Sequence, residues 1–265
     1  MKGRVLIVAG SDSGGGAGIQ ADIKAVTMLD AFAATAITAL TAQNSEGVHG
    51  VLPIDPAFIR QQMEVVLDDI GADAIKTGML HDAGVIETVA TVLAERAPRT
   101  PLVLDPVMVA KGGAPLIQPE AIDALKTRLV PRAAVLTPNL PEAEILCGHA
   151  IGDVDAMRAT ARELLGLGCA AVLLKGGHLD GGTVHDVLAT GAGLTEWASP
   201  RIDSRHTHGT GCTLASAIAA GLAQGMMVTA AVERARDYVQ RAIASAPGFG
   251  RGHGPLDHAH PLRHR

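Results

Sequence analysis

The fold is decided by the apolar run Val5-Leu6-Ile7-Val8-Ala9 and by the glycine loop Gly10-Ser11-Asp12-Ser13-Gly14-Gly15-Gly16-Ala17-Gly18 that follows it directly. Five consecutive apolar residues are typical of a strand that a parallel sheet buries on both faces. After the loop, Ile19, Ile23 and Val26 recur at helical spacing. This part of the chain therefore predicts a strand, a glycine loop and a helix.

The same alternation continues along the chain. Further strands are expected at residues 33–41, 74–77, 102–104, 135–136 and 170–174, a hairpin-like pair at 184–189 and 194–198, and helices at 56–70, 85–97, 157–165 and 228–243. Short connections between alternating strands and helices indicate a mostly parallel sheet with helices on both faces, an α/β architecture. Because no linker interrupts the pattern, we expect one domain over residues 1–265.

The segment 248–265 is rich in glycine, proline and histidine. Its four histidines, His253, His258, His260 and His264, have irregular spacing, which favours a loosely ordered tail over a metal site.

Composition narrows the class of protein. The 265 residues are 48% hydrophobic, enough for a full core, but only 2% aromatic, and the formal charge is −5. Few aromatic residues and no long basic run argue against nucleic acid or an anionic membrane as a partner. The cysteines Cys147, Cys169 and Cys212 lie far apart, as expected of reduced thiols, and no run approaches the ~20 apolar residues of a membrane span. We expect a cytoplasmic protein with a small-molecule partner.

Polar residues follow the predicted strands, where parallel sheets bind their ligands. The residues at these carboxyl ends are Gly10, Asp12, Gln43, Asn44, Gly78, Met79, Asp105, Val107, Asn139, Glu142 and Lys175.

A second glycine turn, His206-Thr207-His208-Gly209-Thr210-Gly211-Cys212-Thr213, precedes a helix of small residues at 214–224. Free backbone N–H groups and the helix dipole at such a turn favour a phosphate. The dipole would also favour a thiolate at Cys212 and so lower its pKa. An ordinary tight turn with a buried cysteine explains this local sequence equally well.

The first glycine loop fits neither of the two common nucleotide-binding motifs. Gly10 and Gly15 have the spacing of a P-loop, but Gly16-Ala17 stands where lysine and serine or threonine must follow. The dinucleotide fingerprint is disfavoured because the strand at 33–41 has no acidic residue at its end. The first loop is therefore interpreted as backbone that lies close to a small polar ligand.

The remaining polar residues suit phosphoryl transfer, which depends on positioning and charge neutralisation. Asn139, Glu142 and Asp105 offer oxygen ligands for Mg²⁺, and Lys175 can reach a phosphate. Together with the glycine turn before the helix, they predict a kinase site without a P-loop.

Several segments resemble the hydroxymethylpyrimidine/phosphomethylpyrimidine kinases of thiamine biosynthesis, which belong to the ribokinase-like family. The matching segments are 9–22 (AGSDSGGGAGIQAD), 41–44 (TAQN), 77–80 (TGML), 104–108 (LDPVM), 137–143 (TPNLPEA), 174–178 (LKGGH) and 208–212 (HGTGC). They occur in order over nearly the whole chain.

This resemblance implies a three-layer α/β/α fold, ATP and Mg²⁺ as cosubstrates, and a homodimer. It also implies two successive phosphorylations, first of 4-amino-5-hydroxymethyl-2-methylpyrimidine and then of its monophosphate. The amide of Gln43 would pair with the aminopyrimidine edge. Gly10, Met79 and Val107 would complete the substrate pocket. The nucleotide would be bound by Lys175, Thr210 and Asn139, and the metal by Glu142, Asn139 and Asp105. Gly209 and Gly211 would bind the transferring phosphate.

Cys212 occupies the position where most ribokinase-like sugar kinases have an aspartate base. A thiolate there could accept the hydroxyl proton in the first transfer, whereas the second transfer starts from a phosphate oxyanion and needs no base.

Two alternatives stay open. Residues 107–113 are expected to form a flexible flap. Some relatives that accept pyridoxal have a cysteine in this flap, where this chain has Ala110 beside Lys111, which favours the pyrimidine without excluding a pyridoxine/pyridoxal kinase. The other alternative is a non-catalytic pyrimidine sensor, which would not need Asp105, Glu142 and Lys175.

Overall fold

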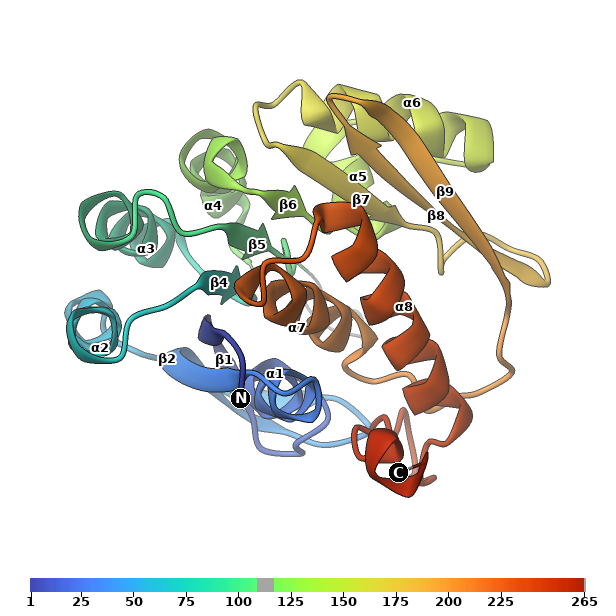
Figure 1. Ribbon diagram of the computed structural model, residues 1–265, viewed down its shortest axis with the longest axis horizontal. Helices are drawn as coiled ribbons and strands as arrows, with labels where there is room; N and C mark the ends of the chain where they lie inside the picture. Colours follow the sequence, from blue (N-terminus) through green and yellow to red (C-terminus); the bar gives the residue numbers. More distant parts are fainter. Residues whose placement is uncertain (109–116, 265) are drawn as a thin grey trace.

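A sheet of nine strands runs through the centre of the structure, a computed structural model that describes residues 1–108 and 117–264 (Figure 1). Its strand order is β3-β2-β1-β4-β5-β6-β7-β8-β9. The strands are β1 (Arg4–Asp12), β2 (Phe32–Gln43), β3 (Val48–Pro53), β4 (Ala74–Thr77), β5 (Leu102–Leu104), β6 (Val135–Leu136), β7 (Ala171–Lys175), β8 (Thr183–Thr190) and β9 (Gly193–Pro200). The strands from β2 to β7 in this order are parallel, and β3, β8 and β9 join the two edges in antiparallel pairing.

Helices cover both faces of the sheet (Figure 1). One face carries α1 (Gly18–Met28), α7 (Thr210–Ala223) and α8 (Val228–Ala244); the other carries α2 (Pro56–Asp69), α3 (Ala83–Arg96), α4 (Pro119–Ala124), α5 (Leu140–Cys147) and α6 (Val154–Leu165). Strand β1 serves both layers, because Val5 and Ile7 pack toward α1 and α7 while Leu6 and Val8 pack toward α2 and α3. The predicted three-layer α/β/α fold is confirmed.

Several elements were not predicted, among them β3 and α4. Strand β3 is almost entirely exposed at the edge of the sheet, so its sequence shows no alternation of apolar and polar residues. Helix α4 continues into one π-helical turn, Leu125–Leu129, and a 3₁₀ turn, Val130–Arg132. None of the helices within the described ranges is long and apolar enough to span a membrane.

The C-terminal segment is packed, so the prediction of a loosely ordered tail is wrong for residues 254–260. Leu256, His258 and His260 are each at most 6% exposed, and the segment lies beside the end of α8 (Figure 1). The Tyr238 hydroxyl donates to the His258 carbonyl at 2.8 Å, and the His258 ring lies 3.0 Å from Thr213 Oγ1 at the start of α7. Burial of side chains against two helices therefore orders a segment that has the composition of a flexible tail.

The topology places a crevice at the carboxyl ends of the parallel strands. Strand order reverses at β1, which has β2 on one side and β4 on the other. The connections that leave β1 and β4 go to helices on opposite faces, so a space opens between them, as in other parallel α/β sheets.

Candidate active site

A cavity of about 410 Å³ lies at this edge of the sheet. All the residues that the resemblance implies for binding substrate, nucleotide, metal and phosphate line it: Gly10, Gln43, Met79, Asp105, Val107, Asn139, Glu142, Lys175, Gly209, Thr210, Gly211 and Cys212. Asn44, which was expected beside them, does not line it; its side chain accepts hydrogen bonds from the amides of Glu46 and Gly47 in the turn before β3. Strand ends that are far apart in sequence thus contribute to one pocket, as predicted.

The turn before α7 requires glycine at position 209. Gly209 caps the helix with a φ of +84°, and a Cβ atom there would lie 1.9 Å from the carbonyl oxygen of Gly16. The two glycine loops therefore pack directly against each other. Within the described part of the chain, the N–H groups of Gly211 and Cys212 have no acceptor, so the first turn of α7 presents free donors at the cavity.

A cation and a carboxylate form the floor of the cavity beside this turn. Lys175 Nζ lies 3.1 Å from Asp105 Oδ1, and the Thr137 hydroxyl donates to the same oxygen at 3.0 Å. Both Asp105 and Lys175 are largely buried, at 2% and 13% side-chain exposure. The pair therefore holds one positive and one negative charge at a fixed position close to Gly211.

Asn139 and Glu142 form a reciprocal cap at the start of α5. The Glu142 amide donates to Asn139 Oδ1 at 2.9 Å, and the Asn139 amide donates to Glu142 Oε2 at 2.7 Å. Burial raises the pKa of Glu142 to about 7 and outweighs the opposite effect of Lys175, while the negative charge of Asp105 adds a smaller effect in the same direction as burial. The cap thus holds a carboxyl group that ionises near neutral pH.

These oxygens fit a magnesium ion that is bound mainly through phosphate and water. Among the residues that the structure describes, no three His, Cys, Asp or Glu side chains cluster to form a complete metal site. Magnesium in kinases is usually held by one or two carboxylates together with substrate phosphates. Asp105 and Glu142 would supply such carboxylates, and Asn139 Oδ1, which accepts one hydrogen bond from the Glu142 amide, would offer its second lone pair.

The sulfur of Cys212 is not a thiolate in this environment. Burial raises its pKa to about 12, with Asp22 and Asp105 acting in the same direction against the positive charge of Lys76. The prediction that the helix dipole lowers this pKa is wrong, since desolvation of the charged form exceeds the effect of the helix end. Cys212 faces the cavity as a neutral thiol.

A fully buried ion pair lies beneath the cavity and was not predicted. Lys76 Nζ is 2.9 Å from Asp22 Oδ2, both side chains are 0% exposed, and the Ser216 hydroxyl donates to the same carboxylate at 2.7 Å. The pair joins β4, α1 and α7 below Cys212. A lysine within the apolar strand Ala74–Thr77 is the sequence signal that could have revealed it.

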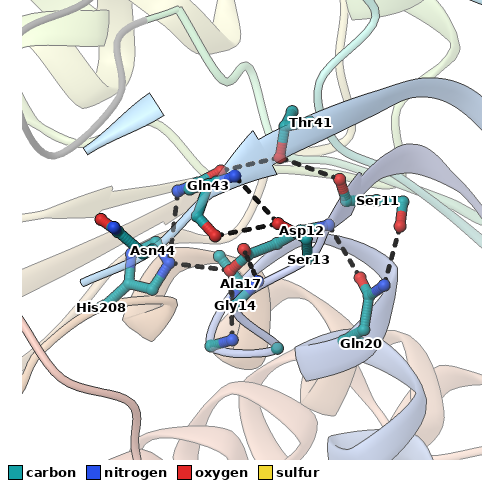
Figure 2. A network of polar contacts seen from close by, with 12 residues as sticks. Ser11, Asp12, Ser13, Gly14, Ala17, Gln20, Thr41, Gln43, Asn44 and His208 are labelled. Atoms are coloured by element: carbon teal, nitrogen blue, oxygen red, sulfur yellow. Dashed lines mark hydrogen bonds and ion pairs between the residues drawn. The ribbon is translucent and has the colours of Figure 1, made fainter. Parts of the chain in front are cut away.

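A second unpredicted pair stands at the rim. His208 Nε2 lies 2.9 Å from Asp12 Oδ2, and its ring also contacts the amide of Gln43 (Figure 2). Asp12 and His208 are separated by 196 residues, so only the fold brings them together.

Comparison with known proteins identifies the family of the chain. The sequence profile of the phosphomethylpyrimidine kinase family matches residues 12–257. The chain is 46% identical to the hydroxymethylpyrimidine/phosphomethylpyrimidine kinase of Bacillus subtilis, covering 96% of this chain and 94% of that protein. It is 53% identical to the thiamine biosynthesis bifunctional protein ThiED of Geobacter sulfurreducens, of which it spans 52%.

Solved structures give the same fold. Bacillus subtilis pyridoxal kinase, in an ADP complex, superposes with a TM-score of 0.92 at 38% identity over 100% of both chains. Phosphomethylpyrimidine kinase from Clostridium difficile has a TM-score of 0.81 at 40% identity, covering 91% of this chain and 100% of that one. On its sequence and its fold, the chain belongs to the phosphomethylpyrimidine kinase family.

Proposed function

We propose that this protein transfers the γ-phosphate of ATP to 4-amino-5-hydroxymethyl-2-methylpyrimidine and then a second phosphate to the resulting monophosphate, in thiamine biosynthesis. The observation that carries the proposal is the single cavity in which a polar amide and an apolar wall lie next to free helix N–H groups, a lysine and two carboxylates. This cavity therefore has groups that would bind the acceptor ring and the phosphate donor next to each other.

The acceptor side of the cavity suits a small flat ring with polar edges. Gln43 provides an amide that both donates and accepts, and Met79 forms an apolar wall. Gly10 keeps the space beside that wall open, since a Cβ there would lie 3.3 Å from the Met79 sulfur. Val107 closes the pocket from the end of β5.

The phosphate side suits a nucleotide. The free amides of Gly211 and Cys212 would donate hydrogen bonds to the transferring phosphate, and Thr210 and Lys175 would bind the neighbouring phosphates. Asp105 and Glu142, with Asn139, would hold magnesium, which supplies charge neutralisation for the phosphates. Lys175 is already held by Asp105, so its charge needs little reorganisation to meet a phosphate oxygen.

The neutral thiol of Cys212 would contact the reacting hydroxyl group. Cys212 lies in the first turn of α7, next to the Gly211 and Cys212 amides that would bind the phosphate. A thiol with a pKa of about 12 already carries its proton, so it would orient the hydroxyl group, whose own proton would pass to a phosphoryl oxygen as the new bond to phosphorus forms. The second transfer starts from a phosphate oxyanion and has no hydroxyl group to orient, so Cys212 matters most for the first.

Pyridoxal is the second candidate acceptor, because a pyridoxal kinase superposes on the whole chain. The flap residues Ala110 and Lys111, which bear on this choice, lie outside the described residues. A homodimer and a cytoplasmic location also stay predictions.

The test is release of ADP from Mg-ATP, with hydroxymethylpyrimidine and pyridoxal offered in parallel and EDTA as a control. The proposal expects turnover of the pyrimidine at a kcat/KM at least tenfold above that of pyridoxal, and none with EDTA. Turnover of pyridoxal alone would show that the protein is a pyridoxal kinase of vitamin B6 metabolism. Binding of the pyrimidine without ADP release would support a sensor instead.

A further inference from the structure

The amide of Gln43 is held on both sides by polar side chains (Figure 2). On one side, His208 Nε2 lies 3.3 Å from the amide and 2.9 Å from Asp12 Oδ2. On the other side, Thr41 Oγ1 lies 3.1 Å from the amide and 3.0 Å from the carbonyl oxygen of Ser11. His208 and Thr41 therefore determine which side of the Gln43 amide carries the oxygen and which carries the NH₂ group.

Asp12 sets the proton on His208. Its carboxylate accepts hydrogen bonds from the backbone amides of Gly14, Gly16 and Ala17 at 2.7 to 3.1 Å. Burial alone would raise the pKa of Asp12, but the hydrogen bonds from His208 and these amides outweigh it and keep the pKa below its usual value. An ionised carboxylate only accepts, so the His208 Nε2 that faces it must carry hydrogen.

The one hydrogen of a protonated Nε2 is donated to Asp12, and this nitrogen then has no lone pair to accept from an NH₂ group, so an oxygen of Gln43 is the favourable neighbour. The Gln43 nitrogen is the atom placed at 3.3 Å from His208, which would set two donors against each other. The Thr41 hydroxyl has one hydrogen and cannot donate to both Ser11 and Gln43. Turning the amide by 180° removes both conflicts, because the oxygen then faces His208 and the NH₂ group donates to Thr41 Oγ1. Oxygen and nitrogen are nearly equal in size, so the packing is unchanged.

We propose that the Asp12–His208 pair, together with Thr41, locks the Gln43 amide with its oxygen toward His208 and its NH₂ group toward Thr41, and that this lock makes the site specific for an amino-substituted ring. The inference rests on the proposed pyrimidine kinase activity. The locked amide pairs with an exocyclic amine on the His208 side and a ring nitrogen acceptor on the Thr41 side. A 4-oxo ring, with a ring N–H beside a carbonyl, presents the reverse pattern and would require the amide to turn.

Asp12, His208 and Thr41 are thus positioning residues that act through Gln43. Turning the amide in the intact protein would leave the His208 N–H and the Thr41 lone pair facing like groups, which is how a polar site rejects a near-isosteric ligand. The oxo ring is therefore penalised by groups that need not touch it.

The test compares kcat/KM for 4-amino-5-hydroxymethyl-2-methylpyrimidine with that for its 4-oxo analogue. The inference expects the wild type to prefer the amino ring, and both His208→Phe and Thr41→Val to lower the amino-to-oxo ratio at least tenfold. Thr41→Ser, which keeps the hydroxyl, should preserve the ratio. His149→Phe is the matched control, since His149 is an exposed histidine paired with Glu163 beyond α5.

The outcomes separate this inference from the proposed function. A lowered kcat/KM with an unchanged ratio in both variants would mean that the pair only supports the fold, and would overturn the lock. If His208→Phe does not fold, Thr41→Val decides alone. Failure of the wild type to phosphorylate either pyrimidine would overturn the proposed function itself.

Discussion

Replacing Glu142 by glutamine should change how the stability of the protein depends on pH. Burial raises the pKa of Glu142 from 4.5 to about 7, and Asp105 acts in the same direction. The folded protein therefore binds this proton more tightly than the unfolded chain. The resulting stabilisation is complete below pH 4.5 and is lost as the pH rises through about 7.

The size of this effect follows from the difference between the two pKa values. One pKa unit corresponds to about 1.4 kcal/mol, so ionising Glu142 costs at most ~3 kcal/mol of unfolding free energy at pH 8. Glutamine carries no charge but keeps an oxygen for the Asn139 amide, so the helix cap survives. Glu142→Gln should match the wild type near pH 4.5 and exceed it in stability at pH 8.

Urea unfolding between pH 4.5 and pH 8, without nucleotide or magnesium, measures this difference directly. Subtracting the wild-type curve from the variant curve cancels the titration of all other groups. Glu120→Gln, at an exposed position in α4, is the control and should give no pH-dependent difference. If the Glu142→Gln and wild-type curves run parallel over this range, the buried carboxyl does not ionise as described.

Three further substitutions test other parts of the site. Gly209→Ala places a Cβ atom on a left-handed backbone and against the Gly16 carbonyl, so the unfolding free energy should fall by about 2 kcal/mol or more. An unchanged urea midpoint would contradict the packing of the two loops. Lys76→Met leaves Asp22 buried without its cation and should lower the unfolding free energy, measured with urea, by ~3–5 kcal/mol. The double variant Lys76→Met/Asp22→Leu should regain most of this loss. A loss below ~1 kcal/mol in Lys76→Met would show that the pair is not buried. Cys212→Ala removes the thiol that would orient the hydroxyl group, so it should slow the first phosphorylation by ~10²-fold and the second far less in single-turnover assays. Equal losses would rule out a special role in the first transfer.

The parallel sheet could be predicted because its central strands are buried on both faces. Continuous apolar runs such as Val5–Ala9 and Leu102–Leu104 are visible in the sequence without any knowledge of their neighbours. The same principle located the cavity, since the polar residues after such strands must gather at one edge. Gln43, Asp105 and Lys175 lie there as predicted.

What could not be predicted depends on contacts between distant segments. The Asp12–His208 pair and the Lys76–Asp22 pair each join elements whose proximity only the folded chain creates. The pKa of Cys212 was predicted in the wrong direction because burial, which a local sequence does not reveal, outweighs the helix end.

The central claim is that one cavity carries out both phosphorylations, and a time course of product masses tests it most directly. With Mg-ATP and 4-amino-5-hydroxymethyl-2-methylpyrimidine as the acceptor, the account predicts the monophosphate first and the diphosphate after it. Gln43→Ala, which removes the amide from the shared pocket, should slow both steps. The claim would be contradicted by a wild-type reaction that stops at the monophosphate, or by a diphosphate step that Gln43→Ala leaves at full rate.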